Sequence, residues 1–160
     1  MAQLKTTFAG LALENPIIIS SSGLTNSAEK IKKLEEAGAG AVVLKSVFEE
    51  QISMQAGSMQ GYGSPEADDY LGAYVRSHAL NEHISLIEET KKICHIPVIA
   101  SINCYSDSEW VDFAIMMEKA GADAISLINT LVGMRINLKT GEPIISIKKG
   151  GYSGPGIYPV

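Results

Sequence analysis

The chain has 160 residues, of which 46% are hydrophobic and 19% are charged, and its formal net charge is −5. These values are typical of a globular domain with its own core and argue against disorder. The acidic balance, without a block of lysines or arginines, argues against a nucleic-acid partner. The two cysteines form no disulfide framework, and no signal peptide or membrane-spanning run is recognisable. We therefore expect a single domain over residues 1–160, located in the cytoplasm and not bound to a membrane.

The first third of the chain predicts a hairpin, a strand and a helix. Residues 1–14 predict a short hairpin with Gly10 in its turn, and the apolar run at 16–20 predicts a strand buried on both faces. The run leads into the small residues 20–23, where backbone can approach a ligand closely. The next helix is predicted to have Asn26 as its N-cap and Glu29 as the partner in a capping box.

Two segments repeat one pattern, in which a helix ends, a glycine turn follows and a short strand begins. Residues 37–46 read AGAGAVVLKS and residues 120–129 read AGADAISLIN. The first segment ends with Lys45 and Ser46, and the second ends with Asn129. Another strand, VIASIN at 98–103, ends with Asn103. Because the carboxyl ends of parallel strands gather at one edge of a sheet, we expect these polar residues to share a site.

The remaining segments predict a long excursion, two helices and a second hairpin. Residues 47–82 contain four glycines and no sustained periodicity, which predicts a lid-like or partly disordered excursion. A helix is expected from Asn81 onwards, and Ser106 with Glu109 predicts a capped helix before the second glycine turn. The two apolar runs around residues 139–142 predict a C-terminal hairpin. The three histidines have uninformative spacings and are expected on the surface.

The alternation of strands and helices predicts an α/β fold with a parallel sheet and right-handed crossovers. Three segments, residues 15–51, 97–106 and 124–159, resemble the dihydroorotate dehydrogenase family, especially its dehydrogenase-like members. The motif INTLVG followed by GGYSGP is the most specific part of this resemblance. The family consists of FMN-dependent (β/α)₈ barrels, so the resemblance implies FMN as cofactor and a dihydropyrimidine such as dihydroorotate as substrate. The implied function is an oxidoreductase of pyrimidine biosynthesis.

The resemblance also assigns roles to individual residues of this chain. Lys45 is the catalytic candidate, because the matching lysine contacts both flavin and substrate. The implied substrate contacts are Lys45, Asn129 and Thr130, and no metal site is implied. The implied flavin contacts are Ser21, Ser22, Gly23, Lys45, Ser46, Asn103, Gly151, Ser153 and Gly154.

The chain departs from the family pattern in its length and in the order of its units. A complete barrel takes about 250 residues, whereas this sequence has 160 residues and passes from the family's third unit directly to its sixth. The segments that match the catalytic base and the FMN-phosphate loops are absent from the sequence. We therefore predict a shortened, internally deleted TIM barrel: a half-barrel of about four parallel strands with a C-terminal β-hairpin. Whether this chain is itself an enzyme is left open by these departures.

Two alternative functions follow from the same residues. A half-barrel leaves two exposed strand edges, so a non-catalytic, engineered or recombined module could pair with a second copy as a homodimer and close an eight-stranded barrel. A small anion- or nucleotide-binding protein could instead use residues 20–23 as a phosphate loop, although no glycine-rich phosphate motif accompanies them.

Overall fold

The computed structural model describes residues 4–48, 65–103, 107–127, 131–133, 136–144 and 150–152. The chain divides into two compact units, Met1–Leu127 and Ile128–Val160, and each unit is described by itself. The first unit contains the helices and the parallel sheet, and the second contains short antiparallel segments. That the whole chain acts as one domain stays a prediction.

The first unit opens with the predicted hairpin. Strand β1 (Thr6–Phe8) pairs antiparallel with β2 (Leu11–Leu13), so that Thr6 lies opposite Leu13. Ala9 and Gly10 form the turn with φ values of 49° and 81°. Glycine adopts this left-handed conformation without steric cost, which explains why Gly10 identifies the turn from sequence.

A parallel sheet follows, built from β3 (Ile18–Ile19), β4 (Ala41–Val43), β5 (Val47–Phe48), β6 (Val98–Asn103) and β7 (Ala124–Leu127). Strand β3 pairs with β4, both β4 and β5 pair with β6, and β6 pairs with β7, all in parallel. Because β7 occupies the other edge of β6, β4 and β5 follow one another along a single edge as one interrupted strand. The sheet therefore has four parallel strand positions, as predicted. Within the described residues it is open, with β3 and β7 at its edges.

Strand β3 is shorter and more exposed than predicted. The expected strand at residues 16–20 is reduced to Ile18 and Ile19, which are half-buried, and the side chain of Ile17 is 57% exposed. The prediction that both faces are buried is therefore wrong for this strand. Its position at the edge of the sheet accounts for the exposure, because an edge strand has a neighbour on one side only.

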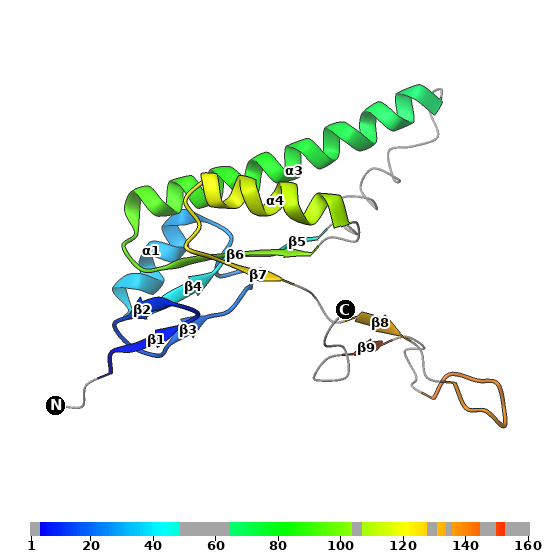
Figure 1. Cartoon of the computed structure of the whole chain (residues 1–160), viewed down its shortest axis with the longest axis horizontal. Helices are drawn as coiled ribbons and strands as arrows, with labels where there is room; N and C mark the ends of the chain where they lie inside the picture. Colours follow the sequence, from blue (N-terminus) through cyan, green and yellow to red (C-terminus); the bar gives the residue numbers. More distant parts are fainter. Residues whose placement is uncertain are drawn as a thin grey trace. The chain divides into compact units, whose positions relative to one another are not determined.

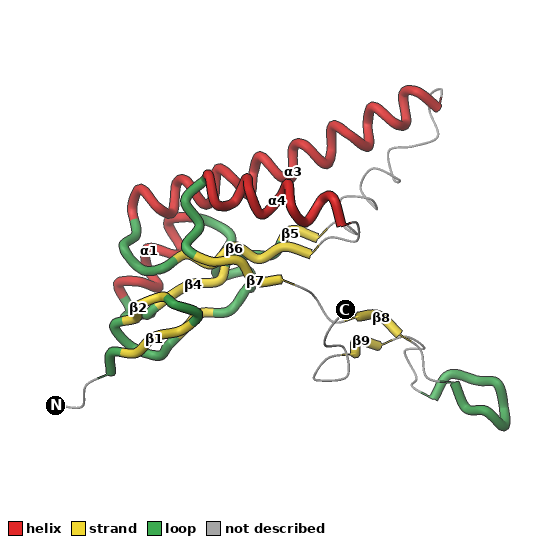
Figure 2. Tube along the Cα trace, in the orientation of Figure 1, coloured by secondary structure: helices red, strands yellow, loops and turns green. Residues whose placement is uncertain are grey.

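Helices α1 (Ala28–Glu36), α3 (Pro65–Ile93) and α4 (Asp107–Lys119) lie on one face of this sheet (Figures 1 and 2). Alternate strand residues point toward the helices, and these form the core together with apolar helix residues. The buried cluster consists of Ile31, Val42, Leu44, Leu80, Ile87, Cys94, Val98, Ala100, Ile102, Phe113 and Met117.

Helix α3 begins much earlier than the sequence predicts. It starts at Pro65 instead of near Asn81, so residues 65–82 of the predicted excursion are helical, and β5 occupies its first two residues. Proline fits the first turn of a helix because the missing N–H has no intrahelical partner there. Gly72 lies inside the helix. Because glycine is a poor helix former, helix propensities do not predict a helix through this residue. Residues 49–64 lie outside the described part of the chain, so a lid there stays a prediction.

The N-cap of α1 is Ser27, one residue after the predicted Asn26. The Ser27 hydroxyl accepts a hydrogen bond from the Lys30 N–H at 3.4 Å, whereas the Asn26 Oδ1 accepts one from the Lys30 ammonium at 2.7 Å. Both residue types are good caps, and sequence alone does not separate neighbours. The predicted cap Ser106 lies outside the described residues.

The two glycine turns of the repeated pattern have the same geometry. Gly38 and Gly121 both have φ of 98°. After α1, Gly38 N–H donates to Glu35 O and Ala39 N–H donates to Leu34 O; after α4, Gly121 and Ala122 make the equivalent bonds. This is the Schellman arrangement, which satisfies the last carbonyls of a helix. The repeat recognised in the sequence is therefore a repeated helix-to-strand connection.

The second unit contains the predicted C-terminal antiparallel hairpin. Ile136 and Pro143 form an antiparallel bridge, Asn137 N–H donates to Glu142 O at 2.9 Å, and Gly141 has φ of 73° in the turn. Strand β8 (Leu131–Gly133) also pairs antiparallel with β9 (Gly150–Tyr152).

Candidate functional site

Three serines from neighbouring strand positions join at the carboxyl end of the sheet. The Ser46 N–H donates to the Ser21 Oγ at 3.0 Å, and the Ser21 and Ser46 hydroxyls are also 3.0 Å apart. The Ser46 hydroxyl is in turn 2.7 Å from the Ser101 hydroxyl. A continuous hydroxyl chain thus links the segment after β3, the segment after β4 and the middle of β6.

This chain of hydroxyls lies on the sheet face turned away from the helices. Ala100 and Ile102 belong to the core under the helices, so Ser101 between them points to the opposite face. Ser126 of β7 is the direct partner of Ser101 in the parallel ladder and extends the row to the fourth strand position.

Ser101 and Ser126 were not among the site residues predicted from the sequence. Both precede the asparagines that drew attention to their strands, Asn103 and Asn129. The sequence does contain a signal for them. Successive side chains of a strand point to opposite faces of the sheet, so in VIASIN and AISL the serines lie on the face opposite the neighbouring aliphatic residues.

The backbone at Lys45 is fixed by the segment that follows β3. The Lys45 N–H donates to the carbonyl oxygen of Thr25 at 3.0 Å. Thr25 is fully buried, with an exposed fraction of 0%. The Lys45 side chain is exposed, although Leu44 before it is fully buried. Exposure of this residue avoids the large cost of burying a charge.

Ser22 and Gly23 complete the same segment. The Ser22 hydroxyl accepts from the Leu24 N–H at 3.2 Å, and the Lys30 ammonium donates to the Gly23 carbonyl at 3.1 Å. A Cβ added at Gly23 would meet no heavy atom within 4 Å in the described part of the chain. The structure therefore leaves open space beside the backbone at Gly23, where the sequence predicts a ligand.

Asn103 is the last residue of β6 and pairs with Phe48 of β5, three residues after Lys45 in the chain, so it lies closer to the carboxyl end of the sheet than Lys45 does. Gly151 lies in β9 of the second unit, opposite Val132. The other predicted site residues, Asn129, Thr130, Ser153 and Gly154, lie outside the described residues. The structure thus brings Ser21, Lys45 and Ser46 together with Ser22 and Gly23 nearby, and the roles assigned to these residues stay predictions.

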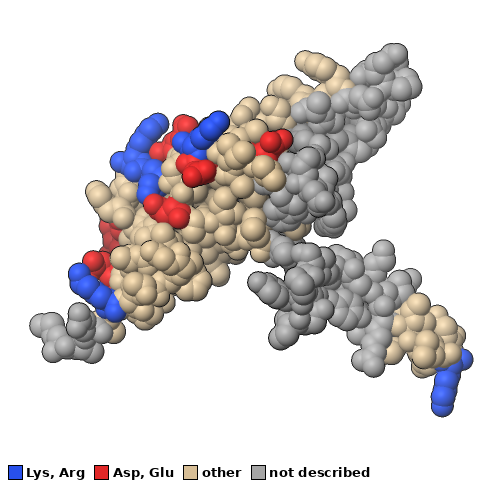
Figure 3. Space-filling model, in the orientation of Figure 1, with Lys and Arg blue, Asp and Glu red and all other residues tan. Residues whose placement is uncertain are grey.

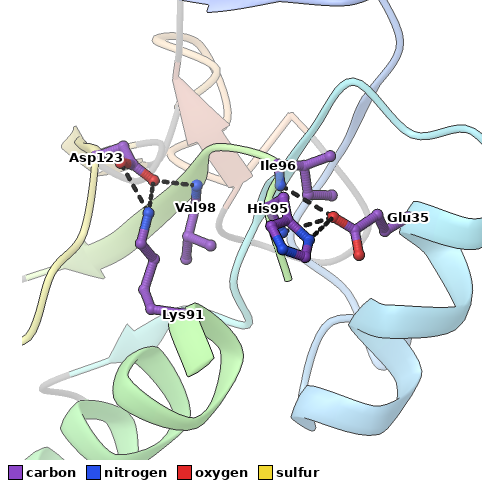
Figure 4. Close-up of polar contacts among 6 residues, drawn as sticks. All are labelled: Glu35, Lys91, His95, Ile96, Val98 and Asp123. Carbon is purple, nitrogen blue, oxygen red and sulfur yellow. Dashed lines mark hydrogen bonds and ion pairs between the residues drawn. The ribbon is translucent and has the colours of Figure 1, made fainter. Parts of the chain in front are cut away.

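The opposite, amino end of β6 is held by two carboxylates (Figure 4). Asp123 Oδ2 accepts from the Val98 N–H at 2.7 Å and from the Lys91 ammonium at 2.9 Å. Glu35 Oε1 accepts from the N–H groups of His95 and Ile96 at 2.6 and 3.2 Å.

The environment of Glu35 favours its charged form. Burial raises the pKa of this carboxyl, but hydrogen bonds from Lys32 and from the backbone at His95 outweigh burial, so the pKa is lowered overall. The Lys32 ammonium lies 2.5 Å from Glu35 Oε2. An ionised carboxylate accepts hydrogen bonds from backbone N–H groups, so Glu35 fixes the position of the backbone at His95 and Ile96. This end of the sheet therefore has a structural role.

Other kinds of site find less support in the residues that the structure describes. They contain no group of three or more metal-ligating side chains, and none of their helices is long and apolar enough to cross a membrane. On the face drawn in Figure 3, lysines of the described residues lie beside aspartates and glutamates over the helices of the first unit.

Comparison with known proteins connects about half of this chain to one group of enzymes. Over 76 residues, 48% of the chain, it is 43% identical to the catalytic subunit of dihydroorotate dehydrogenase B (NAD(+)) from Bacillus pumilus (strain SAFR-032). The proteins of the same name from Halalkalibacterium halodurans and Bacillus cytotoxicus are 44% and 41% identical over 75 residues, 47% of the chain. No family model matches the chain.

The matched part covers 24% of the length of each of these relatives. The resemblance to the dihydroorotate dehydrogenase family is thus confirmed over about half of this chain.

Proposed function

We propose that this chain, half of which is similar to dihydroorotate dehydrogenase B catalytic subunits, binds FMN at the carboxyl end of its parallel sheet. In this proposal it serves a dihydroorotate dehydrogenase-type oxidoreductase of pyrimidine biosynthesis in the cytoplasm, with dihydroorotate or a related dihydropyrimidine as substrate. The sheet is then part of a (β/α) barrel, in which ligands bind at the carboxyl ends of the strands.

The observation that carries this proposal is the meeting of Ser21, Lys45 and Ser46 at one end of the sheet. Hydroxyl groups of Ser21 and Ser46 lie 3.0 Å apart, and Lys45, next to Ser46 in the chain, is an exposed residue. The carbonyl and nitrogen edge of a flavin requires such donors. No heavy atom of the described residues lies within 4 Å of a Cβ placed at Gly23, which supports close approach of a ligand to the backbone there.

FMN, when bound, supplies the hydride acceptor. Lys45 stabilises negative charge on flavin or substrate by a charge-assisted hydrogen bond. Ser21, Ser22, Ser46 and Asn103 orient the flavin, and Gly23 allows its close approach. Asn129 and Thr130 hold the pyrimidine in this proposal. Gly151, Ser153 and Gly154 complete the flavin contacts.

The test is a flavin titration of the purified chain. We expect FMN fluorescence to be quenched with a stoichiometry near one per chain, and Lys45→Ala to weaken binding at least about tenfold, because a hydrogen bond to a charged group is lost. Lys92→Ala is the matched control, since Lys92 is an exposed lysine in the last turn of α3, before β6 begins. Equal affinities of wild type and Lys45→Ala would contradict the role of Lys45, and absence of quenching would contradict the function.

A second candidate function is self-assembly without turnover. It is favoured by the two strand edges, β3 and β7, that have a partner on one side only within the described residues. Two copies of a four-stranded parallel sheet supply the eight strands of a closed barrel. In this case the homodimer, and not the single chain, is the functional form.

A further inference from the structure

Two consecutive amides, at Lys45 and Ser46, are both held by the segment that follows β3. The Lys45 N–H donates to the Thr25 carbonyl at 3.0 Å, and the Ser46 N–H donates to the Ser21 hydroxyl at 3.0 Å. The candidate ligand-binding lysine therefore takes its backbone position from a segment about 20 residues earlier in the chain.

Thr25 is the residue that gives this segment its shape. Its hydroxyl accepts from the Ser22 N–H and donates to the Ser22 carbonyl, both at 3.1 Å. Its own N–H donates to the same carbonyl at 3.2 Å. The side chain is fully buried, so water cannot replace these bonds. The turn from Ser22 to Thr25 is closed by them, and it fixes the direction in which the Thr25 carbonyl points.

We propose that Thr25 is a positioning residue, which closes the turn after β3 and thereby fixes the backbone of Lys45 at the carboxyl end of the sheet. It acts through its carbonyl oxygen and does not itself contact a ligand. The consequence for ligand binding rests on the flavin function proposed above, whereas the positioning itself concerns hydrogen bonds within the chain.

Three variants separate this role from general stability. Thr25→Val keeps the branched shape but removes the hydroxyl, which deprives the Ser22 N–H of its acceptor and the Ser22 carbonyl of one of its two donors. Thr25→Ser keeps the hydroxyl. Ser27→Ala removes the N-cap of α1, which weakens the neighbouring helix but leaves the contacts of Thr25 and Lys45 in place.

The first measurement is amide hydrogen exchange in the chain without ligand. In Thr25→Val we expect the amides of Lys45 and Ser46 to exchange about tenfold faster relative to the amide of Val98, because a local opening becomes easier. Thr25→Ser restores the slow exchange, and Ser27→Ala leaves the ratio unchanged. Two results overturn the positioning role. One is an equal acceleration of all amides in Thr25→Val, and the other is a ratio in Ser27→Ala that rises as much as in Thr25→Val.

The second measurement is the FMN titration of the same variants. Thr25→Val is expected to weaken FMN binding by at most about tenfold, because affinity falls only as far as the fraction of molecules in the closed, competent state falls, with Thr25→Ser close to wild type and Ser27→Ala unchanged. If wild type fails to bind FMN while the exchange effect at Lys45 is present, the flavin function is overturned and the positioning role stands. If wild type binds FMN and Thr25→Val alters neither exchange nor affinity, the positioning role is overturned.

Discussion

His83 is a buried histidine in the middle of α3. The residue is 4% exposed, and its Nε2 has no hydrogen-bond partner among the residues that the structure describes. Burial lowers its pKa to about 4. The prediction that all three histidines lie on the surface is wrong for this residue. It failed because the helix was expected to begin at Asn81, where residue 83 would lie in the first turn. With a start at Pro65, His83 lies on the same helix face as Leu80 and Ile87.

The burial of His83 predicts that the chain loses stability in mild acid. In the unfolded chain this histidine binds a proton below its ordinary pKa of about 6.5, whereas in the folded chain it does so only near 4. The unfolded state therefore binds more protons between these values, and stability falls as pH falls through this window. Between pH 7 and pH 5 the loss is about 2 kcal/mol. In His83→Leu this loss disappears, as measured by urea unfolding at both pH values. His78→Leu, at an exposed histidine of the same helix, keeps it.

Glu35 predicts a second acid effect in a separate pH range. Its pKa is lowered in the folded chain, so its contribution to stability is present above its ordinary value near 4.5 and is lost as pH falls through the lower folded value. Glu35→Gln is expected to cost about 1–2 kcal/mol at pH 7 and to remove this dependence below pH 4.5. Urea unfolding at pH 7 and pH 3.5 measures the stability of Glu35→Gln. Glu36→Gln, at an exposed neighbouring residue, is the control. An equal loss of stability in both variants would contradict the role of Glu35 in holding the backbone at His95 and Ile96.

At the scale of elements, the two helix–glycine–strand connections share a backbone but differ at one position. Gly40 of the first corresponds to Asp123 of the second, and each donates its N–H to a neighbouring carbonyl, Ile17 O at 2.8 Å or Val98 O at 2.9 Å. In the second connection the side chain of Asp123 holds β6 to α3. In the first, a Cβ at residue 40 would lie 2.3 Å from the carbonyl oxygen of Asn15. Glycine is therefore required there by close contact with backbone.

This difference predicts a ranking of alanine substitutions at the glycines. Gly38→Ala and Gly121→Ala place alanine at φ of 98°, which costs about 1–2 kcal/mol each. Gly40→Ala forces a backbone shift and is expected to cost roughly 3 kcal/mol. Urea unfolding of the three variants measures the order, and Gly23→Ala, where open space surrounds the Cβ position, serves as control. A smaller cost at Gly40 than at Gly38 would show that the Asn15 segment can move away.

Sequence patterns predicted most of the elements, because each depends on local chemistry. The run VIASIN coincides with β6 (Val98–Asn103), and both glycine turns end helices as expected. The start of α3 was missed because Gly72 is a poor helix former and because the sequence at the start of this helix shows no regular apolar stripe. The hydroxyl contact from Ser46 to Ser101 joins residues 55 positions apart, and such pairings become visible only once the order of strands in the sheet is known.

At the scale of the whole molecule, the open sheet gives the assembly proposal a specific test. A two-fold axis parallel to the strands would set β3 of one copy beside β7 of the other in parallel, and so close an eight-stranded barrel. In that barrel, the sheet face turned away from the helices becomes the interior. Ser126 lies on this face and is exposed in the single chain, whereas Val111 is exposed on α4 outside it.

A lysine at position 126 therefore distinguishes the closed dimer from the single chain. In a monomer the charge stays in water and costs little, but in a closed barrel it enters a packed interior without a partner, which is strongly unfavourable. We expect wild type to sediment with twice the mass of one chain, Ser126→Lys to sediment as a monomer with intact helical circular dichroism, and Val111→Lys to remain a dimer. A wild-type monomer would contradict closure by a second copy. A dimer that persists in Ser126→Lys would mean that the copies associate through another surface, since no closed barrel could accommodate that charge.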